Sequence, residues 1–371
     1  MANKRFIVLA CDGGGVRGLI TAKLLKDLDP AFLQQVSLFS GTSTGSIIAL
    51  GLAGGVPIEQ IEALYRSMAD CNTIFTPYLS ASEVAAAQVQ LAAARQAARS
   101  AAALSDDGSW WWKILELVGT VGAQLAFPKY KSDGLQKLLT SYFPALTVAQ
   151  LASRHEKYAV VPSFQINSGS AGGAWKPALF HNLPGLTITP ELASTSLIDA
   201  ALCSAAAPLF FGPHAIPSGS YIDGGVFANN PCSTAIAAYL ASSLNTQVTL
   251  DRTNFAAVSI GTGDVSNSYP PPNPLFPYGM LGWLYPYQSG PAPAFPLIQA
   301  MFDGGSAIDD LTSQMILRNS TYIRANPVFD QTWSLDDCAS LDQMNALTDA
   351  YINDSQDWKD KKKAINALVS G

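Results

Sequence analysis

Ser43 stands in a setting that favours nucleophilic chemistry. It is the middle residue of a G-x-S-x-G pattern, in which Gly41 and Gly45 flank it. Glycine at both places permits the sharp, strained turn that exposes a nucleophilic serine hydroxyl. A helix is predicted to follow, and its positive N-terminal end would favour negative charge on the serine oxygen. The pattern therefore predicts a nucleophile, whereas a serine that only caps the helix is the alternative.

Histidine is a poor candidate for the base that a serine nucleophile needs. The sequence has three histidines, His155, His181 and His214, and none stands in a recognisable catalytic context. In α/β-hydrolases the acid and then the histidine follow the serine along the chain, but here no histidine follows residue 214. We therefore expect all three histidines to be structural.

Asp223 is the better candidate for the base. It follows a short predicted strand, residues 220–222, and precedes Gly224 and Gly225, so the chain can turn there and present the carboxylate. A carboxylate that is removed from water in an apolar pocket is a stronger base than one in solution. We predict a dyad of Ser43 and Asp223, whereas an aspartate that bonds its own turn is the alternative.

A run of three glycines, Gly13, Gly14 and Gly15, offers unobstructed N–H groups just before a predicted helix. Such a loop holds an anion well, and acyl transfer needs an oxyanion hole. Arg17 follows closely and has three possible roles: it adds charge to the hole, anchors a phosphate headgroup or lies at the surface. We predict that the glycine run is the oxyanion loop.

The same segment also matches the dinucleotide-binding pattern G-x-G-x-x-G, which ends at Gly18. That pattern requires an acidic residue about 20 residues further on, at the end of the next strand. Residues 40–43, with the sequence SGTS, occupy this place. An oxyanion loop therefore fits the segment better than a pyrophosphate loop.

The order of the elements indicates how these residues are positioned. Apolar runs at residues 6–11 and 36–39 are typical of buried strands, and each is followed by a glycine-containing turn and a helical pattern. This βαβα start predicts a parallel sheet with helices on its faces. Asp12, Ser43 and Asp223 each follow a predicted strand, so we expect them at the edge where the carboxyl ends of parallel strands gather.

The remainder of the chain continues the alternation of strands and helices. Strands are predicted at residues 157–166, 175–181 and 255–260, and helices at residues 189–206, 306–319 and 340–369. Residues 84–127 are alanine-rich and then aromatic and amphipathic, which predicts a cover over the core or a mobile cap that touches a membrane. Residues 265–302 hold nine prolines and no charge. We expect this segment to line a substrate channel, to touch lipid or to pack on the core.

The composition indicates a globular chain. Hydrophobic residues make up 48% and charged residues 13%, and the net charge of −6 argues against a nucleic-acid polymer as a partner. The five scattered cysteines predict buried thiols in a reducing compartment rather than disulfides. No histidine pairs with a cysteine at zinc-ligand spacing. Signal-peptide and membrane-span patterns are absent as well, so we expect a cytoplasmic chain without a metal or cofactor.

Five blocks of the sequence occur in the order of one known family: residues 12–18 (DGGGVRG), 41–45 (GTSTG), 204–208 (SAAAP), 223–225 (DGG) and 229–231 (NNP). Together they resemble the patatin-like phospholipase family. Cys203 stands where this family commonly has alanine before the serine of the S-x-A-x-P block. The resemblance covers residues 5–235 by motif and the rest of the chain more loosely.

The resemblance implies a three-layer α/β/α sandwich with a mostly parallel central sheet. It implies a single domain, residues 1–371, in which residues 236–371 complete the fold. It also implies a calcium-independent lipid acyl hydrolase in which Ser43 is the nucleophile and Asp223 the base. The amides of Gly14 and Gly15, with Gly13 as a further candidate, would form the oxyanion hole, assisted by Arg17.

The partner implied by the resemblance is a phospholipid or a related acyl ester, reached by transient contact with a membrane surface. Neither a metal nor a cofactor is implied, and the oligomeric state is left open. Two alternatives stand beside the hydrolase. The chain is a catalytically silent lipid-binding protein, or it is a phospholipase that a small molecule or nucleotide switches on.

Overall fold

A single eight-stranded sheet organises the part of the chain that the computed structural model describes. This part comprises residues 5–80, 82–86, 89, 127–168, 175–186, 192, 194–245, 250–265, 283, 296–318, 321–331 and 333–369. The order of the strands is β5-β6-β3-β2-β1-β7-β9, with β4 beside β3. The bounds of these strands are β1 Phe6–Cys11, β2 Leu38–Gly41, β3 Tyr158–Asn167, β4 Lys176–His181, β5 His214–Ile216, β6 Gly219–Asp223, β7 Phe255–Ile260 and β9 Thr321–Ala325.

Helices and a small strand pair surround this sheet. Strands β8 (Asp264–Val265) and β10 (Val328–Phe329) form the parallel pair. The α-helices are α1 Gly18–Asp27, α2 Pro30–Gln35, α3 Thr44–Ala53, α4 Ile58–Arg66, α5 Met68–Ile74, α8 Asp133–Tyr142, α9 Gln150–His155, α11 Leu197–Ala205, α12 Cys232–Ala241, α14 Pro296–Ile316, α15 Leu341–Asp354 and α16 Gln356–Asn366. Short 3-10 helices are η1 Gly15–Arg17, η2 Gly224–Val226 and η3 Cys338–Ser340.

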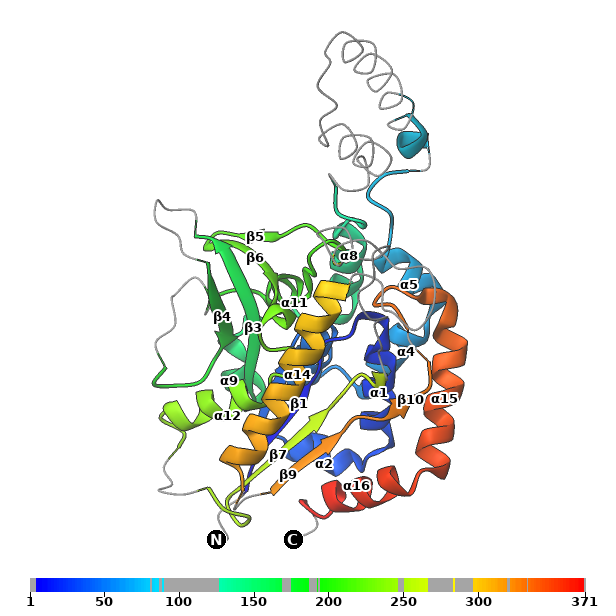
Figure 1. Ribbon diagram of the computed structural model, residues 1–371. Helices are drawn as coiled ribbons and strands as arrows, with labels where there is room; N and C mark the ends of the chain where they lie inside the picture. Colours follow the sequence, from blue (N-terminus) through cyan, green and yellow to red (C-terminus); the bar gives the residue numbers. More distant parts are fainter. Residues whose placement is uncertain are drawn as a thin grey trace, which may run out of the picture.

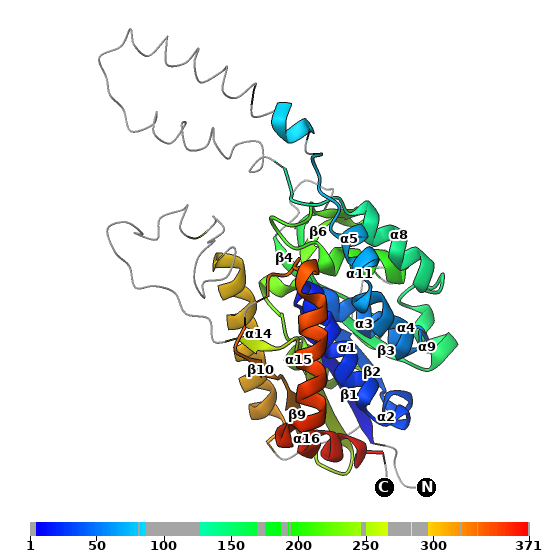
Figure 2. The same ribbon diagram turned by 90° about the vertical axis from the view of Figure 1, so that its right-hand side faces the viewer.

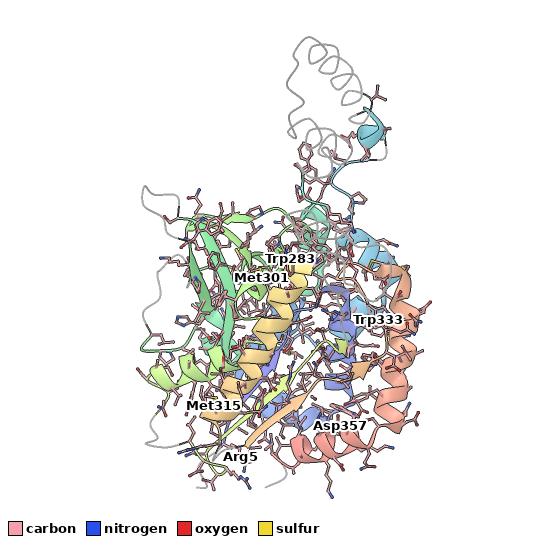
Figure 3. The ribbon with its side chains drawn as sticks, viewed as in Figure 1. Arg5, Trp283, Met301, Met315, Trp333 and Asp357 are labelled. Carbon is pink, nitrogen blue, oxygen red and sulfur yellow. A yellow bond between two sulfur atoms is a disulfide. The ribbon has the colours of Figure 1, made fainter. Side chains whose placement is uncertain are left out.

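Helices cover both faces of the sheet, which confirms the predicted α/β/α sandwich. The apolar run of β1 fills both sides, because Ile7 and Leu9 join the core cluster with α1, α3 and α15, whereas Val8 and Ala10 join the cluster with α12. Figure 1 shows α12 and α14 on one face, and Figure 2 shows α14 on the side opposite α1 and α4. Side chains fill the space between these layers (Figure 3). Because successive side chains of β1 point to opposite faces and helices cover both faces, the strand has no polar position.

The sheet is mostly parallel, but β6 runs against β3, and this corrects the predicted route of Asp223 to the site. Strand β2 pairs in parallel with the start of β3, where Ser40 lies opposite Val160. Strand β6 pairs antiparallel with the later residues of β3, where Asp223 lies opposite Ser163. The expectation that Asp223 follows a parallel strand was therefore wrong. The ends of β2 and β6 instead face each other alongside β3, and this brings Asp223 toward the turn after β2.

Three predicted helix bounds were also wrong, each for a local reason. Helix α11 begins only at Leu197, because the Ser196 side chain accepts a hydrogen bond from Asp199 N and caps it there. The predicted helix over residues 340–369 is interrupted at Ser355, whose side chain accepts from Trp358 N and begins α16. Helix α14 begins at Pro296, ten residues before the predicted start at 306.

Two predicted segments lie almost entirely outside the described residues. They are the cover or cap over residues 84–127 and the proline-rich segment 265–302, of which residues 296–302 belong to α14. Within the described residues, no helix has the length and apolar character that a membrane crossing requires.

The cysteine prediction was wrong for two of the five residues. Cys71 of α5 and Cys338 of η3 form a disulfide, although 267 positions separate them in the sequence. Sequence spacing could not reveal this pair, because α5 and η3 become neighbours only in the folded chain. Cys11, Cys203 and Cys232 are buried free thiols, as predicted. The cysteines therefore no longer indicate a reducing compartment.

Removal of the disulfide should destabilise the fold. In a Cys71→Ala/Cys338→Ala variant, the unfolded chain regains the freedom of a very long loop, so we expect the free energy of unfolding to fall by about 2–5 kcal/mol. Urea unfolding of both proteins with and without dithiothreitol measures this change. The double variant is the control, because dithiothreitol should not change its urea midpoint when this disulfide is absent. Equal midpoints for oxidised and reduced wild type would contradict the prediction.

Candidate active site

Ser43 sits in a strained turn between β2 and α3. Its φ of 53° and ψ of −124° lie in a region that non-glycine residues rarely adopt, and this costs roughly 1–3 kcal/mol. The side chain makes no capping hydrogen bond to α3, which speaks against the alternative of a helix cap. Gly45 lets α3 approach β1, because a Cβ at this position would lie 2.1 Å from the Cys11 carbonyl oxygen.

Ser204 holds the strained turn in place. The N–H of Ser43 donates to Ser204 Oγ at 3.0 Å, and the Ser204 hydroxyl donates to the Pro162 carbonyl at 2.7 Å. Ser204 is completely buried on α11. The serine of the S-x-A-x-P block therefore ties the Ser43 turn to β3, and the Ser43 amide keeps a partner despite its unusual backbone.

Asp223 is fully buried at the end of β6, and it makes the bond to its own turn that the alternative predicts. Its Oδ1 accepts from Gly225 N at 2.7 Å, but its Oδ2 has no hydrogen-bond partner among the described residues. Burial raises the pKa of Asp223 to about 7, while the Ser43 side chain and the hydrogen bond from Gly225 N oppose the rise. No hydrogen bond of standard geometry joins Ser43 and Asp223 among the described residues, but the effect on the pKa places the two side chains in one environment.

The glycine loop lies directly against the Ser43 turn. A Cβ on Gly13 would lie 3.2 Å from the Ser43 Cβ. The N–H of Gly13 is already donated to the Asn229 carbonyl at 3.0 Å. No described residue accepts the N–H of Gly14 or Gly15. Among the described residues, the Gly14 and Gly15 N–H groups therefore remain without an acceptor, whereas the Gly13 N–H does not.

The charged residues of the first block lie behind this loop. Asp12 is buried and pairs with Arg324 of β9 through two contacts, Nη1 to Oδ1 at 2.7 Å and Nη2 to Oδ2 at 2.5 Å. Arg17 is also buried, and its Nε donates to the Gly14 carbonyl at 3.3 Å. Its Nη1 donates to the Gly263 carbonyl at 3.5 Å. Neither residue lines the pocket at Ser43.

The other motif glycines permit close packing around the two chemical groups. A Cβ on Gly18 would lie 2.4 Å from Thr44 Oγ1, and one on Gly41 would lie 2.0 Å from the Gly45 carbonyl oxygen. A Cβ on Gly224 would likewise lie 2.3 Å from the Pro162 carbonyl oxygen. Gly225 leaves room for Phe302 of α14, whose ring would lie 2.8 Å from a Cβ there.

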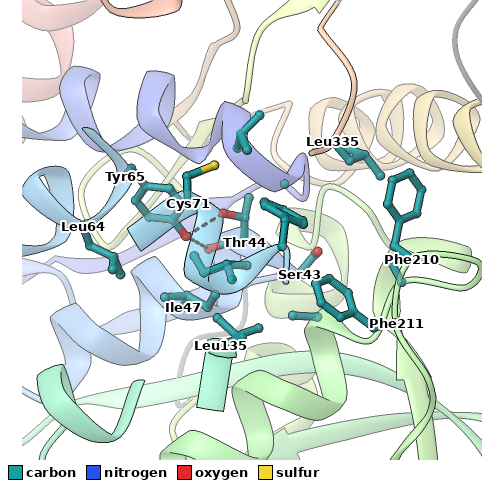
Figure 4. Close-up of a pocket in the computed structure, with 16 residues that line it drawn as sticks. Ser43, Thr44, Ile47, Leu64, Tyr65, Cys71, Leu135, Phe210, Phe211 and Leu335 are labelled. Atoms are coloured by element: carbon teal, nitrogen blue, oxygen red, sulfur yellow. Dashed lines mark hydrogen bonds between the residues drawn. The ribbon is translucent and has the colours of Figure 1, made fainter. Parts of the chain in front are cut away.

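An apolar pocket of about 60 Å³ opens at Ser43. Figure 4 shows the Ser43 hydroxyl on the side of the pocket that Phe210, Phe211 and Leu335 close. Thr44 and Tyr65 bond each other through their hydroxyls at 2.5 Å, so their polar atoms are satisfied. The lining is otherwise mainly apolar and comprises Gly15, Val16, Ser43, Thr44, Ile47, Leu64, Tyr65, Cys71, Ile74, Phe75, Leu135, Ala205, Ala207, Phe210, Phe211 and Leu335.

Several residues around the site were not predicted from the sequence as site residues. Leu335 contributes its carbonyl to Val16 N at 2.8 Å and so anchors the end of the glycine loop. Thr262 donates to the Gly13 carbonyl at 2.9 Å, and Asn229 contacts the same carbonyl at 3.5 Å. A signal existed for Thr262, because it stands between two glycines at the end of a strand. No local signal marks Phe302 or Leu335, which lie far along the chain.

Comparison with known proteins decides the family. The model of the patatin-like phospholipase family matches residues 9–236, which is more than half of the chain. The chain belongs to this family. Its motifs at Gly13–Gly15, Ser43 and Asp223 all fall within the matched residues.

Individual relatives are distant and longer. The protein CotR of Bacillus subtilis is 28% identical over 265 residues, which cover 70% of this chain and 63% of CotR. A cGAMP-activated phospholipase of Pseudomonas aeruginosa is 26% identical over 60% of this chain and 54% of its own. The crystal structure of VipD from Legionella pneumophila covers 94% of this chain and 67% of its own, at 15% identity and a TM-score of 0.34. The chain thus matches less than two thirds of the length of the first two relatives.

Loss of the Ser204 hydroxyl should destabilise the Ser43 turn. Ser204→Ala leaves the Ser43 N–H buried without a partner, which costs about 1–3 kcal/mol of unfolding free energy. Ser46→Ala is a matched control, because it removes an equally buried hydroxyl but leaves the Ser43 carbonyl bonded by Ser46 N. Urea unfolding of both variants measures the difference. A loss no larger in Ser204→Ala than in Ser46→Ala would count against this role.

Proposed function

We propose that the chain is a lipid acyl hydrolase that cleaves carboxylic esters of phospholipids or related lipids through Ser43 and Asp223. One observation carries the proposal. A strained serine that lines an apolar pocket lowers the pKa of a buried carboxylate, one oxygen of which has no hydrogen-bond partner among the described residues. A carboxylate with a pKa of about 7 suits a general base near neutral pH.

The reaction follows from these positions. Asp223 accepts the hydroxyl proton of Ser43 while Oγ bonds to the ester carbonyl carbon and the carbonyl electron pair moves onto oxygen. The N–H groups of Gly14 and Gly15 and the N-terminal end of α3 stabilise the resulting oxyanion. The electron pair then returns, the bond to the alcohol breaks, and the alcohol leaves with the proton from Asp223. Water repeats the sequence on the acyl-serine, releases the fatty acid and restores Ser43.

The lining of the pocket supports an acyl chain as the group that it holds. Ile47, Leu64, Phe75, Leu135 and Phe211 offer apolar contact and no charge. The fatty-acyl part of the substrate therefore fits this pocket better than a polar headgroup. The intact Ser43 and Asp223 argue against a catalytically silent lipid-binding protein.

A second candidate is a phospholipase that a nucleotide switches on. It is favoured by the similarity to the cGAMP-activated phospholipase of Pseudomonas aeruginosa. The two candidates share the same chemistry at Ser43 and differ only in the need for an activator. Assays with and without cyclic GMP–AMP separate them, because an activator-dependent enzyme is silent without the nucleotide.

Substitution of Ser43 should abolish ester hydrolysis. We expect Ser43→Ala to lower kcat at least about a thousandfold, because the covalent step loses its nucleophile. Release of p-nitrophenol from a short ester and of fatty acid from mixed phospholipid vesicles, without added calcium, measures the change. Replacement of His155, His181 or His214 by Gln serves as the control and should leave most activity. Retained activity in a clean Ser43→Ala preparation would refute the mechanism.

Activity should rise with pH through the pKa of Asp223. The base must be ionised to accept the serine proton, and its pKa is about 7. We therefore expect kcat/KM for the short ester to rise about tenfold per pH unit below pH 7 and to level off above it. Ser43→Ala provides the blank for uncatalysed hydrolysis. A level profile down to pH 5 would show that no such group acts as the base.

A further inference from the structure

The glycine loop contacts a residue from the turn after β7, the strand that pairs with β1. Thr262 follows β7 and is 4% exposed. Its Oγ1 donates to the Gly13 carbonyl at 2.9 Å. Its side chain also packs against Gly14, where a Cβ would lie 2.3 Å from the Thr262 hydroxyl oxygen. A single threonine thus contacts both residues of the first peptide group in the loop.

Because of the geometry of the peptide group, this contact also determines the direction in which the Gly14 N–H points. In a planar trans peptide, the C=O and the N–H point in opposite directions. The Gly13 carbonyl and the Gly14 N–H belong to the same peptide group, so the bond that draws the carbonyl toward Thr262 directs the N–H away from Thr262. The Gly14 N–H has no acceptor among the described residues, and Gly13 packs against Ser43. The amide is therefore available on the side away from Thr262.

The turn that carries Thr262 is itself fixed on two sides. Gly261 N donates to the Ala325 carbonyl at 2.8 Å, and Gly263 N donates to Asn326 Oδ1 at 2.9 Å. On the other side, Thr21 Oγ1 donates to the Gly261 carbonyl at 2.8 Å. Thr262 is thus presented by a rigid support and not by a free loop. Asn229, the other donor to the Gly13 carbonyl, is more distant at 3.5 Å.

We propose that Thr262 is a positioning residue of the oxyanion hole, and that its hydroxyl sets the direction of the Gly14 N–H. This inference rests on the proposed hydrolase function. It predicts that loss of the hydroxyl weakens stabilisation of the transition state but not binding of the ground-state ester. Loss of one direct oxyanion donor lowers kcat about 10²–10³-fold in enzymes of this kind. For a misdirected donor we expect a loss of about 10–100-fold.

The test compares Thr262→Val, which keeps the shape but loses the hydroxyl, with Thr262→Ser, which keeps the hydroxyl. We expect kcat for the short ester to fall about 10–100-fold in the valine variant with KM nearly unchanged, and to stay near wild type in the serine variant. Thr348→Val is a matched control, because it removes an equally buried threonine-to-carbonyl hydrogen bond in α15, away from the site. Should Thr262→Val fail to fold, the Thr262→Ala and Thr262→Ser pair isolates the hydroxyl.

A second readout separates positioning from general stability. Ser43 Oγ adds to the carbonyl carbon of an alkyl trifluoromethyl ketone, its proton passes to Asp223, and the carbonyl electron pair forms a hemiketal oxyanion. The ¹³C chemical shift of that carbon, followed against pH, gives the pKa of the hemiketal hydroxyl. Tenfold weaker stabilisation of the oxyanion raises this pKa by about one unit. We expect that rise in Thr262→Val and not in Thr348→Val.

The outcomes are distinct. Unchanged kcat and an unchanged hemiketal pKa in Thr262→Val would overturn the role of Thr262 while the hydrolase proposal stands. A fall in kcat that serine fails to rescue would also overturn it. Wild type that neither hydrolyses ester nor adds to the ketone would overturn the proposed function and this inference together.

Discussion

The site depends on keeping the Asp223 carboxylate buried beside Ser43 without a complete set of hydrogen-bond partners. A buried charge with one oxygen that has no partner among the described residues is costly, and burial accordingly raises the pKa of Asp223 to about 7. Backbone hydrogen bonding and strand pairing hold the residue in place. Asp223 N donates to the Ala206 carbonyl at 3.0 Å, and β6 pairs with β3 at this position. The oxygen without a partner among the described residues is the one that would accept a proton in the proposed reaction.

Residues beyond the family match support this arrangement. The matched region ends at residue 236, but β7 and β9 complete the sheet beside β1. Arg324 of β9 neutralises Asp12 at the start of the glycine loop, and Phe302 of α14 packs beside Gly225. Leu335 accepts from Val16 at the end of the loop, and the nearby Cys338 is joined to Cys71 in the pocket wall. The last third of the chain therefore surrounds a site whose chemical groups lie in the first two thirds.

The sequence predicted the parts of the fold that local patterns encode. Doubly buried strands such as β1 and β7 are continuous apolar runs, and glycine-flanked turns marked Ser43 and Asp223. The direction of β6 was not predictable, because a strand of this length carries no signal of its partner. The Cys71–Cys338 disulfide and the Thr262 contact also depend on proximity between distant segments. Helix bounds failed where a single serine, Ser196 or Ser355, decided the start by capping.

The central claim is that Asp223 activates Ser43, and covalent labelling with an alkyl fluorophosphonate tests it most directly. The serine oxygen displaces fluoride at phosphorus, so the rate of labelling reports the nucleophilicity of Ser43. Intact-mass kinetics and peptide mapping should place a single adduct on Ser43 in the wild type. In Asp223→Asn, which keeps the shape but cannot act as a carboxylate base, labelling should slow at least about a hundredfold. Equal rates in the two proteins, or an adduct on another residue, would contradict the account.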